Sequence, residues 1–444
     1  MKKRMSLLFV IMLMAVTVLA ACSGGGTAEQ PPSQGEQTEQ PPAEGNGTET
    51  TEPPAEGGDE SQGYFEAADP SLNPAAALNR KDTLIVGMTA PKGVFSPFYW
   101  QTAYDKFVVE AMFDSFFSIQ GDGTYANRLA ESVEVSEDKL KYTFKLKPGV
   151  TYSNGDPVTV KDYAFAMKVY HDSSYDGQTD MLSVNIKGGK EYNEGKATDI
   201  SGIKVIDDNT IEIEVTEANA MTKDNLGTVS FVPESYYGKG YKQGNLEYMK
   251  ELHAKPIGSG QYVLKSFSPG QEVVLEANPN YFLGAPKIKN VIYKTTTEET
   301  RLAMFQSGEI DMDMVTVNED NVEALKEMGF LDINIFPTNG YGYVAMNHKD
   351  PKFQDPKVRQ ALIYGLNRAE VVEIIYGQYA NVINIPQSSQ SWAYTEEGIE
   401  PHEFDMEKAK QLLDEAGWAP GADGIREKDG KKFEIHFSAT ADNP

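Results

Sequence analysis

Residues 131–170 read ESVEVSEDKLKYTFKLKPGVTYSNGDPVTVKDYAFAMKVY. Within 142–146, Tyr, Phe and Leu alternate with Thr and Lys, which is the period-two pattern of a half-exposed strand. Thr159 and Asp162 form an acidic variant of a capping box, directly before apolar residues at helical spacing. The stretch therefore predicts a strand, a turn and a helix in succession, and with them a mixed α/β protein.

Further strands and helices are predicted on both sides of this stretch. Strands are expected at 83–88, 211–215, 262–267, 272–276 and 433–437, the third and fourth joined by a hairpin turn at Ser268-Pro269-Gly270. Helix starts are expected at Thr296 with Glu299, at Asp355-Pro356, at Asn367 with Glu370 and at Asp405, and helix ends at Gly308, Gly377 and Gly417. Such a chain should contain several sheets and two or three domains.

Motifs for catalysis are weak in this sequence. Gly258-Ser259-Gly260 precedes a predicted strand rather than a helix, so it predicts a tight turn and neither a nucleophile elbow nor a dinucleotide loop. Asp311-Met312-Asp313 predicts one solvated face of a strand, with a metal site as the less favoured alternative. The five His residues are scattered and are expected at the surface or in loops: His171, His253, His348, His402 and His436.

Composition excludes several classes of protein. The 444 residues contain 40 Lys and Arg against 66 Asp and Glu, a formal net charge of −26, and a single Cys. Clustered cationic side chains for phosphate contacts are not supplied, so no nucleic acid partner is expected. One thiol also excludes a disulfide framework and the usual four-ligand structural zinc sites.

The N-terminus predicts secretion and anchoring. Cationic residues at 2–4 precede an apolar run at 7–21, which is too short for an ordinary membrane span and predicts a signal peptide at 1–21. Leu19-Ala20-Ala21-Cys22 resembles the lipobox of bacterial lipoproteins, so Cys22 is the expected lipidation site. Residues 22–81 are expected to be a lipid-anchored, disordered linker, because PPAEG recurs in a polar, Pro- and Glu-rich stretch.

Several blocks together resemble one family, the extracytoplasmic solute-binding proteins of ABC importers for oligopeptides, dipeptides and nickel (family 5). The blocks lie at 131–136, 142–150, 152–159, 256–262, 278–282, 307–311, 353–361, 367–368 and 405–418. Tyr152 stands where Phe or Trp is usual, and Ser259 and Gln261 replace the commoner Thr and Pro. The blocks keep the family's order from residue 83 to the end of the sequence.

The resemblance implies an α/β, class II periplasmic-binding-protein-like fold, with two lobes that close on a solute about a hinge and an extra subdomain in lobe one. Carried onto this chain, lobe one takes 82–125 and 240–335, the inserted subdomain 126–239, the hinge 338–346 and lobe two 336–444. In the family a further stretch completes lobe two and supplies the acidic residue that pairs with a peptide's terminal ammonium. We therefore expect lobe two to be incomplete and the sequence to be truncated at its C-terminus.

The resemblance also implies ligand-contacting residues after the first strand, at the hinge and in lobe two. These are Tyr99, Trp100, Gln101, Tyr104, Asn339, Gly340, Tyr341, Tyr343 and Trp392. For the cluster after the first strand, packing in the core is an equal alternative. A peptide in such a cleft is held through its backbone, with its side chains in hydrated pockets.

The implied function is that of a substrate-binding lipoprotein of an ABC importer, anchored outside the cytoplasmic membrane. It would capture oligopeptides or dipeptides and deliver them to permease subunits with their ATPases. No enzyme activity, cofactor or metal is implied, and a monomer is expected. The alternatives are a peptide- or pheromone-sensing receptor and a nickel- or sugar-binding member of the same family. A secreted hydrolase is disfavoured because the sequence offers no nucleophile and base pair.

Overall fold

The computed structural model describes residues 63–120, 124–338, 340–389, 391 and 394–438. The predicted signal peptide, Cys22, most of the predicted linker, Asn339 and Trp392 lie outside these residues. The described part contains helices and five sheets, as the sequence predicted for a mixed α/β chain.

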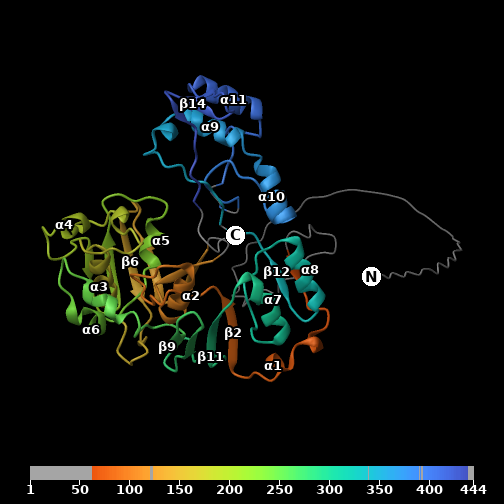
Figure 1. The fold of residues 1–444 in the computed structure, drawn as a ribbon. Helices are drawn as coiled ribbons and strands as arrows, with labels where there is room; N and C mark the ends of the chain where they lie inside the picture. Colours follow the sequence, from red (N-terminus) through yellow and green to blue (C-terminus); the bar gives the residue numbers. More distant parts are fainter. Residues whose placement is uncertain (1–62, 121–123, 339, 390, 392–393, 439–444) are drawn as a thin grey trace, which may run out of the picture. The chain divides into compact units, whose positions relative to one another are not determined.

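The first large sheet has four strands in the order β2-β11-β10-β9 (Figure 1). Its strands are β2 (Thr83–Met88), β9 (Tyr262–Ser268), β10 (Glu272–Ala277) and β11 (Asn290–Thr295). β9 and β10 form the predicted antiparallel hairpin, whereas β11 runs parallel to β2. Side chains alternate across β2, so that Met88 joins the main core on one face and Ile85 packs into a smaller core on the other.

The second large sheet is antiparallel, in the order β5-β6-β8-β7. Its strands are β5 (Ala130–Val135), β6 (Lys141–Leu146), β7 (Ile203–Val205) and β8 (Thr210–Glu214). The predicted alternation at 142–146 is confirmed, because Tyr142, Phe144 and Leu146 are buried. Lys204 on β7 forms an ion pair with Glu212 on β8 at 3.0 Å. One face therefore closes the core and charged pairs cover the other.

Helix α3 (Val160–Tyr170) starts at the predicted capping box of Thr159 and Asp162. The aromatic packing beneath it centres on Phe116. The Phe116 ring stacks on Phe144 at a centroid distance of 4.3 Å and lies 4.9 Å from Tyr163 of α3. The same buried cluster includes residues of both large sheets, so one continuous core supports α3 and strands of both sheets.

A smaller core lies between α7 (Glu298–Ser307), α8 (Glu319–Met328) and β12 (Ile333–Ile335). Its buried members are Phe305, Ile310 and Leu325. The predicted helix start is one residue early, because the N-cap of α7 is Thr297 and its capping-box partner is Thr300 rather than Glu299. The helix ends at Gly308, as predicted.

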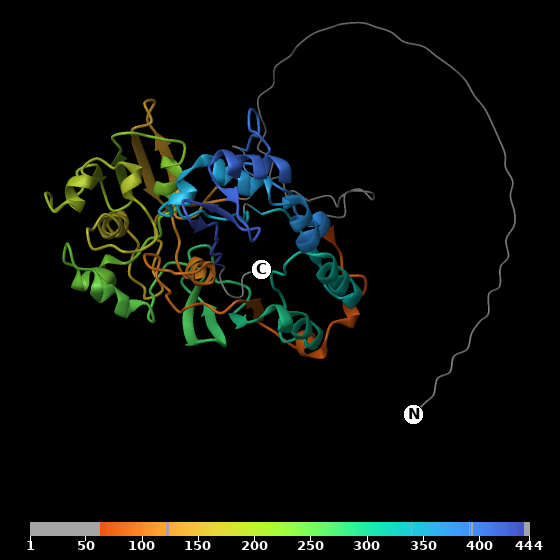
Figure 2. The same ribbon diagram turned by 45° about the horizontal axis from the view of Figure 1, so that its top comes forward.

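The part that follows residue 350 contains α9 (Pro356–Tyr364), α10 (Arg368–Tyr376), α11 (Met406–Glu415) and a small sheet of β13 (Ala419–Pro420), β14 (Arg426–Lys428) and β15 (Lys431–Lys432). The predicted N-caps Asp355, Asn367 and Asp405 are confirmed. Helices α9 and α11, blue in Figure 2, share a core in which the Trp418 ring packs on Phe433 at 4.8 Å. The predicted strand at 433–437 is wrong, since only Lys431–Lys432 pairs with β14.

The described residues also contain further short helices and strands. They are β1 (Gly63–Phe65), α1 (Ala75–Leu78), α2 (Ala103–Met112), β3 (Phe117–Ile119), β4 (Tyr125–Asn127), α4 (Gly189–Asn193), α5 (Thr222–Gly227), α6 (Glu234–Tyr237) and six short 3₁₀ turns at Pro70–Leu72, Leu182–Val184, Gly238–Gly240, Glu247–Leu252, Pro351–Gln354 and Gly377–Tyr379.

The predicted linker extends too far along the chain. Residues 63–81 contain β1, a 3₁₀ turn and α1, so the expectation of disorder through residue 81 is wrong for this stretch. Antiparallel pairing of β1 with β12 explains the order. The partner strand lies about 270 residues later in the sequence, and local composition carries no information about it.

Asp311 and Asp313 point into the protein, contrary to the predicted solvated face. Asp311 accepts a hydrogen bond from the backbone N–H of Ile85 at 2.8 Å. Asp313 accepts from Arg301 Nε at 2.9 Å and from Thr296 Oγ1 at 2.8 Å. The predicted strand is absent, since Met312 forms only an isolated parallel bridge with Val86. The predicted solvated face is also wrong, because distant donors satisfy both carboxylates.

His171 is buried, contrary to the expected surface or loop position. It caps the C-terminus of α3, where its Nδ1 donates to the carbonyl oxygen of Met167 at 2.8 Å. Its Nε2 is buried and has no partner among the described residues. Burial lowers the pKa of His171 below its ordinary value, so the folded state holds the ring neutral.

We expect the free energy of unfolding to fall as the pH drops below about 6.5, because His171 then binds a proton in the unfolded chain but not in the folded state. One such group weakens folding by at most about 1.4 kcal/mol per pH unit in this range. Urea unfolding of the His171→Gln variant should show a smaller difference between pH 7 and pH 5 than the original protein. Between pH 7.5 and 8.5 the free energies of unfolding of the two proteins should change with pH in parallel. If the variant lost as much stability as the original protein between pH 7 and pH 5, His171 would not be the group responsible.

Candidate functional site

Three parallel strand segments end at the same edge of the first large sheet. β2 and β11 are parallel, and Met312 forms a parallel bridge with Val86 on the other side of β2. The segments that follow them are 89–102, 296–297 and 313–318. Ligands of open α/β sheets bind outside the carboxyl ends of parallel strands. This edge of the first large sheet is therefore the candidate site.

A buried carboxylate fixes the longest of these segments. Asp105 lies in the first turn of α2, where it completes a capping box with Thr102. Its Oδ1 also accepts from the backbone N–H of Gly93 at 2.9 Å. Its Oδ2 accepts from the N–H groups of Thr102 at 3.1 Å and Gln101 at 3.3 Å. One side chain thus ties both ends of the loop 93–102 to the start of α2.

The predicted contact residues on this loop differ in how far they are buried. Tyr99 is buried, with its ring 5.6 Å from Tyr175 and 5.5 Å from His253, and its Oη has no partner among the described residues. Trp100 is half-buried, with Lys106 Nζ 5.5 Å from its ring centroid, and Gln101 is exposed. Tyr99 therefore fits the core-packing alternative, whereas Trp100 and Gln101 remain available for contact.

The remaining predicted residue of this cluster, Tyr104, is half-buried on α2, and its ring lies 6.2 Å from Phe107. Burial, with a smaller contribution from Asp176, raises the pKa of Tyr99 above its usual value. Burial followed by the nearby Lys250 lowers the pKa of His253. Both rings are therefore neutral at physiological pH, and the loop packs against uncharged aromatic side chains.

Tyr341 and Tyr343, at the predicted hinge, are open to solvent. Their exposed fractions are 41% and 78%, and their ring centroids lie 5.9 Å apart. Gly340 between Tyr341 and the undescribed Asn339 is exposed as well. The predicted Trp392 lies outside the described residues. Two neighbouring exposed aromatic rings offer apolar area with polar tips.

Sequence reasoning missed Met312 and Met314. They alternate with the inward-pointing Asp311 and Asp313, and their exposed fractions are 56% and 60%. Met314 follows the parallel bridge and so stands at the carboxyl edge defined above. The alternation was visible in the sequence, but its phase was assigned the wrong way round. Flexible, polarizable Met side chains suit contact with varied apolar groups.

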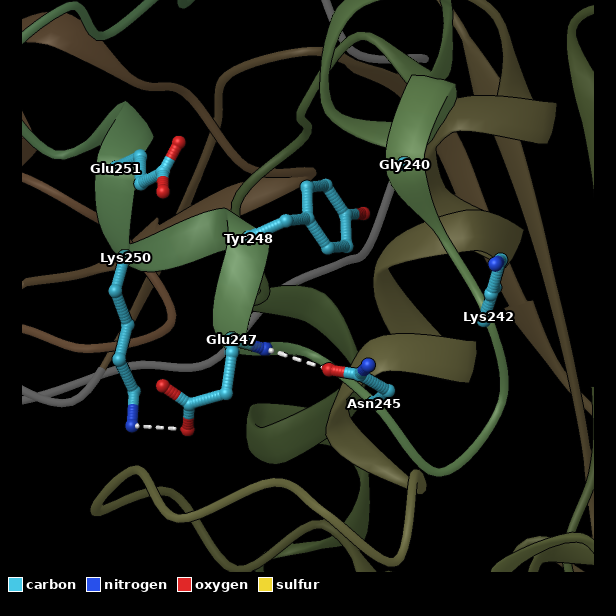
Figure 3. A pocket seen from close by; sticks show the side chains of 7 residues that line it. All are labelled: Gly240, Lys242, Asn245, Glu247, Tyr248, Lys250 and Glu251. Carbon is cyan, nitrogen blue, oxygen red and sulfur yellow. Dashed lines mark hydrogen bonds and ion pairs between the residues drawn. The ribbon is translucent and has the colours of Figure 1, made fainter.

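A hollow of about 510 Å³ lies elsewhere, and no predicted site residue lines it (Figure 3). Its lining residues are Gly240, Lys242, Asn245, Glu247, Tyr248, Lys250 and Glu251. Lys250 pairs with Glu247 at 2.9 Å, and Asn245 accepts from the Glu247 N–H at 3.3 Å. Lys250 also pairs with Asp176, which does not line the hollow, at 2.9 Å.

Comparison with known proteins decides the family. Residues 124–444 match the family model described as bacterial extracellular solute-binding proteins, family 5 middle. The chain belongs to family 5. Family 5 is a family of substrate-binding transport proteins found outside the cytoplasm or in the periplasm, and it is not an enzyme family.

Two curated relatives in family 5 illustrate the likeness. The chain is 32% identical over 323 residues to the oligopeptide-binding protein AppA of Bacillus subtilis, an alignment that covers 71% of this chain and 56% of AppA. It is 27% identical over 366 residues to the dipeptide-binding protein of Escherichia coli, covering 79% of this chain and 66% of that protein. The chain thus spans little more than half the length of AppA.

The solved structures agree with this family 5 assignment. AppA from Bacillus subtilis, solved with a nonapeptide, superposes with a TM-score of 0.68 at 27% identity, covering 79% of this chain and 67% of that one. NikZ from Campylobacter jejuni, solved with Ni(L-His), gives 0.65 at 22% identity over 80% and 66%, which supports the fold alone. The expected α/β, class II periplasmic-binding-protein fold is confirmed.

The described residues of this family 5 chain contain neither a candidate metal cluster nor a candidate membrane span. No group of three or more His, Cys, Asp or Glu side chains that could hold a metal ion occurs among them. Within the same residues, no helix is both long enough and apolar enough to cross a membrane. The carboxylates of Asp311 and Asp313 are instead used in hydrogen bonds to Ile85, Arg301 and Thr296.

Proposed function

We propose that this protein is the substrate-binding component of an ABC importer that captures oligopeptides outside the cytoplasmic membrane and presents them to a permease with its ATPases. The likeness to AppA, which was solved with a nonapeptide bound, carries this proposal. A solute-binding protein makes and breaks no bond. It needs a cleft whose closure the ligand stabilises, because the ligand shifts the equilibrium toward the closed form.

The residues at the carboxyl edge of the first large sheet suit an extended peptide as ligand. Trp100 and Gln101 stand on the loop that Asp105 holds, and Met314 stands at the same carboxyl edge. In the proposed domain division, lobe one takes 82–125 and 240–335 and the hinge 338–346, which places Tyr341 and Tyr343 at the crossing to lobe two. Aromatic rings and Met side chains accept many peptide side chains, while backbone hydrogen bonds give affinity without much sequence preference.

Ligand analysis tests the proposal directly. The protein is isolated as its own cells produce it, the bound material is released by denaturation, and mass spectrometry identifies it. We expect a mixture of short peptides. Recovery of a nickel complex, a sugar or haem in place of peptides would contradict the peptide assignment while keeping the protein in its family.

A substitution in the aromatic pair gives a quantitative test. Tyr343→Ala should weaken the binding of a mixed peptide library about five- to tenfold in calorimetry, since one aromatic contact contributes about 1 kcal/mol. Tyr125→Ala is the matched control, because Tyr125 is also an exposed Tyr and lies on β4, which carries no proposed contact. Equal affinity of both variants and the original protein would exclude Tyr343 from the site.

We also propose that Cys22 carries the lipid that holds the mature protein at the membrane. The Leu19-Ala20-Ala21-Cys22 sequence supports this assignment, and buried acyl chains contribute about 0.8 kcal/mol per methylene. Cys22→Ser should move nearly all of the protein from the membrane fraction to the soluble fraction or the medium on immunoblots, whereas Ser23→Ala should leave it in the membrane fraction. Unchanged membrane association of Cys22→Ser would overturn the assignment.

A further inference from the structure

Residues 63–80 form what we call the N-terminal clasp, a segment whose contacts lie almost entirely with residues 308–335. β1 pairs with β12 in antiparallel register, with Gly63 opposite Ile335 and Phe65 opposite Ile333. The clasp precedes β2, so this pairing is additional to the large sheet. The last strand of the first lobe thus has Gly63–Phe65 as its partner.

Contacts along the clasp continue this attachment. The N–H of Ala67 donates to Asp332 Oδ1 at 3.0 Å, and the N–H of Asp69 donates to the carbonyl oxygen of Gly329 at 2.8 Å. The Phe65 ring receives Lys326 Nζ at 4.1 Å from its centroid. These contacts are few, lie near the surface and follow one another in sequence.

The far end of the clasp is held more firmly. Arg80 donates to the carbonyl oxygen of Gly308 and forms an ion pair with Asp311 at 3.3 Å, with 13% and 22% of the two side chains exposed. Beyond it, the carbonyl oxygen of Asp82 accepts from the N–H groups of Lys289 and Asn290, both at 2.9 Å. The attachment therefore strengthens from Gly63 toward Asp82, where the large sheet begins.

We propose that the N-terminal clasp is a peelable junction between lobe one and the tether, by which we mean the part of the predicted lipid-anchored linker that precedes Gly63. The junction opens from Gly63 and stops at Arg80. The antiparallel register carries the argument. The chain upstream of Gly63 and the chain downstream of Ile335 leave the β1–β12 ribbon at the same end. Tension between them loads the hydrogen bonds one at a time, which is the weakest arrangement for a pair of strands.

Opening has two consequences. Residues 63–79, released and extended at about 3.3–3.6 Å per residue, add up to about 60 Å to the reach of the tether. At the same time β12 loses its partner, and β12 leads directly to the proposed hinge at 338–346. The clasp therefore links the state of the tether to the stiffness of the segment on which lobe closure would depend. This second consequence rests on the proposed domain division, whereas the peeling itself does not.

Hydrogen exchange of single amides, measured without ligand, tests the proposal independently of the proposed function. Peeling predicts graded protection, lowest at Tyr64 and at β12, higher at Ala67 and Asp69, and highest at Lys289 and Asn290, whose N–H groups the Asp82 carbonyl accepts. Equal protection along 63–80 and at Lys289 and Asn290 would overturn peeling in favour of one cooperative unit.

Two variants weaken the clasp without disturbing the core. Gly63 has φ +137°, a backbone angle that residues with a side chain rarely adopt, and a Cβ added there would have no atom within 4 Å. Gly63→Ala therefore introduces backbone strain without a steric clash. Asp332→Ala removes the acceptor of the Ala67 N–H. In both variants, the amides of Ile333–Ile335 should exchange at least tenfold faster, while those of β11 remain unchanged. Glu327→Ala on α8, an exposed residue outside the clasp contacts, is the control and should change neither. Unchanged exchange of β12 in both clasp variants would overturn the junction.

Discussion

Replacing Arg301 by Leu is expected to lower the free energy of unfolding by about 3–5 kcal/mol, because a buried carboxylate is left without its cation. Arg301 Nε lies 2.9 Å from Asp313 Oδ2, and the two side chains are only 7% and 2% exposed. After the substitution, Asp313 keeps only the hydroxyl of Thr296 as a donor among its described contacts. Urea denaturation at pH 7 measures the loss.

Geometry leaves Asp313 no alternative position. A Cβ on Gly87 of β2 would lie 2.3 Å from Asp313 Oδ2, so the carboxylate occupies the space where another residue would have a side chain. Nor is solvent accessible to it, since only 2% of the Asp313 side chain is exposed. The carboxyl group therefore remains buried without its cation in the folded state of Arg301→Leu, which is costly.

The double variant Arg301→Leu/Asp313→Leu separates the charge from the packing. Removing both partners of a buried pair is often close to neutral, so much of the loss should be recovered. Lys204→Ala, which breaks the partly exposed pairs of Lys204 with Glu212 and Glu214, is the surface control and should cause no measurable change. A loss in Arg301→Leu no larger than in Lys204→Ala would show that the pair does not stabilise the fold.

Local signals in the sequence were sufficient for most helices and strands. The N-caps at Thr159, Asp355, Asn367 and Asp405 were predicted correctly, because a capping side chain and its N–H partner lie within three residues of each other. The hairpin of β9 and β10 was predicted for the same reason, since its turn lies between the strands. The family blocks then indicated the order of these elements.

Long-range partners explain what could not be predicted. Asp311 was assigned to solvent because its partners, Ile85 and Arg80, precede it by more than 200 residues. Residues 63–80 were predicted to be linker because their partners lie at 308–335. Among the predicted site residues, Tyr99 and Trp100 are adjacent and both aromatic, yet one is buried and the other half-exposed. Only the packing of Tyr175 and His253 against Tyr99 distinguishes them.

The second large effect is expected at the turn 256–260, which packs against the end of α2. The N–H of Gly260 donates to the carbonyl oxygen of Met112 at 2.9 Å, and the carbonyl oxygen of Gly258 accepts from the Ser153 N–H at 2.9 Å. The turn thus satisfies a carbonyl that the last turn of α2 would otherwise leave without a donor. Ser259 between the two Gly residues is fully buried.

Gly258→Ala should cost about 3 kcal/mol of folding free energy or more, at the upper end of the usual range for overpacking. A Cβ at this position would lie 2.0 Å from the Met112 carbonyl oxygen and 2.9 Å from its carbonyl carbon. The obstacle is helix backbone and not the end of a flexible side chain, so relief requires α2 to move. Since Asp105 of α2 holds the loop that carries Trp100 and Gln101, the same shift should weaken ligand binding in molecules that still fold.

Gly342→Ala is the matched control, because nothing lies within 4 Å of a Cβ built at Gly342. We expect its urea midpoint to equal that of the original protein or to rise slightly, since Ala reduces the entropy of the unfolded chain. Gly258→Ala should lower the midpoint strongly, and amides near the C-terminus of α2 should exchange faster than those of α3. A Gly258→Ala protein as stable as Gly342→Ala would mean that the turn 256–260 does not hold the end of α2 in place. The position of the loop 93–102 would then depend on Asp105 alone.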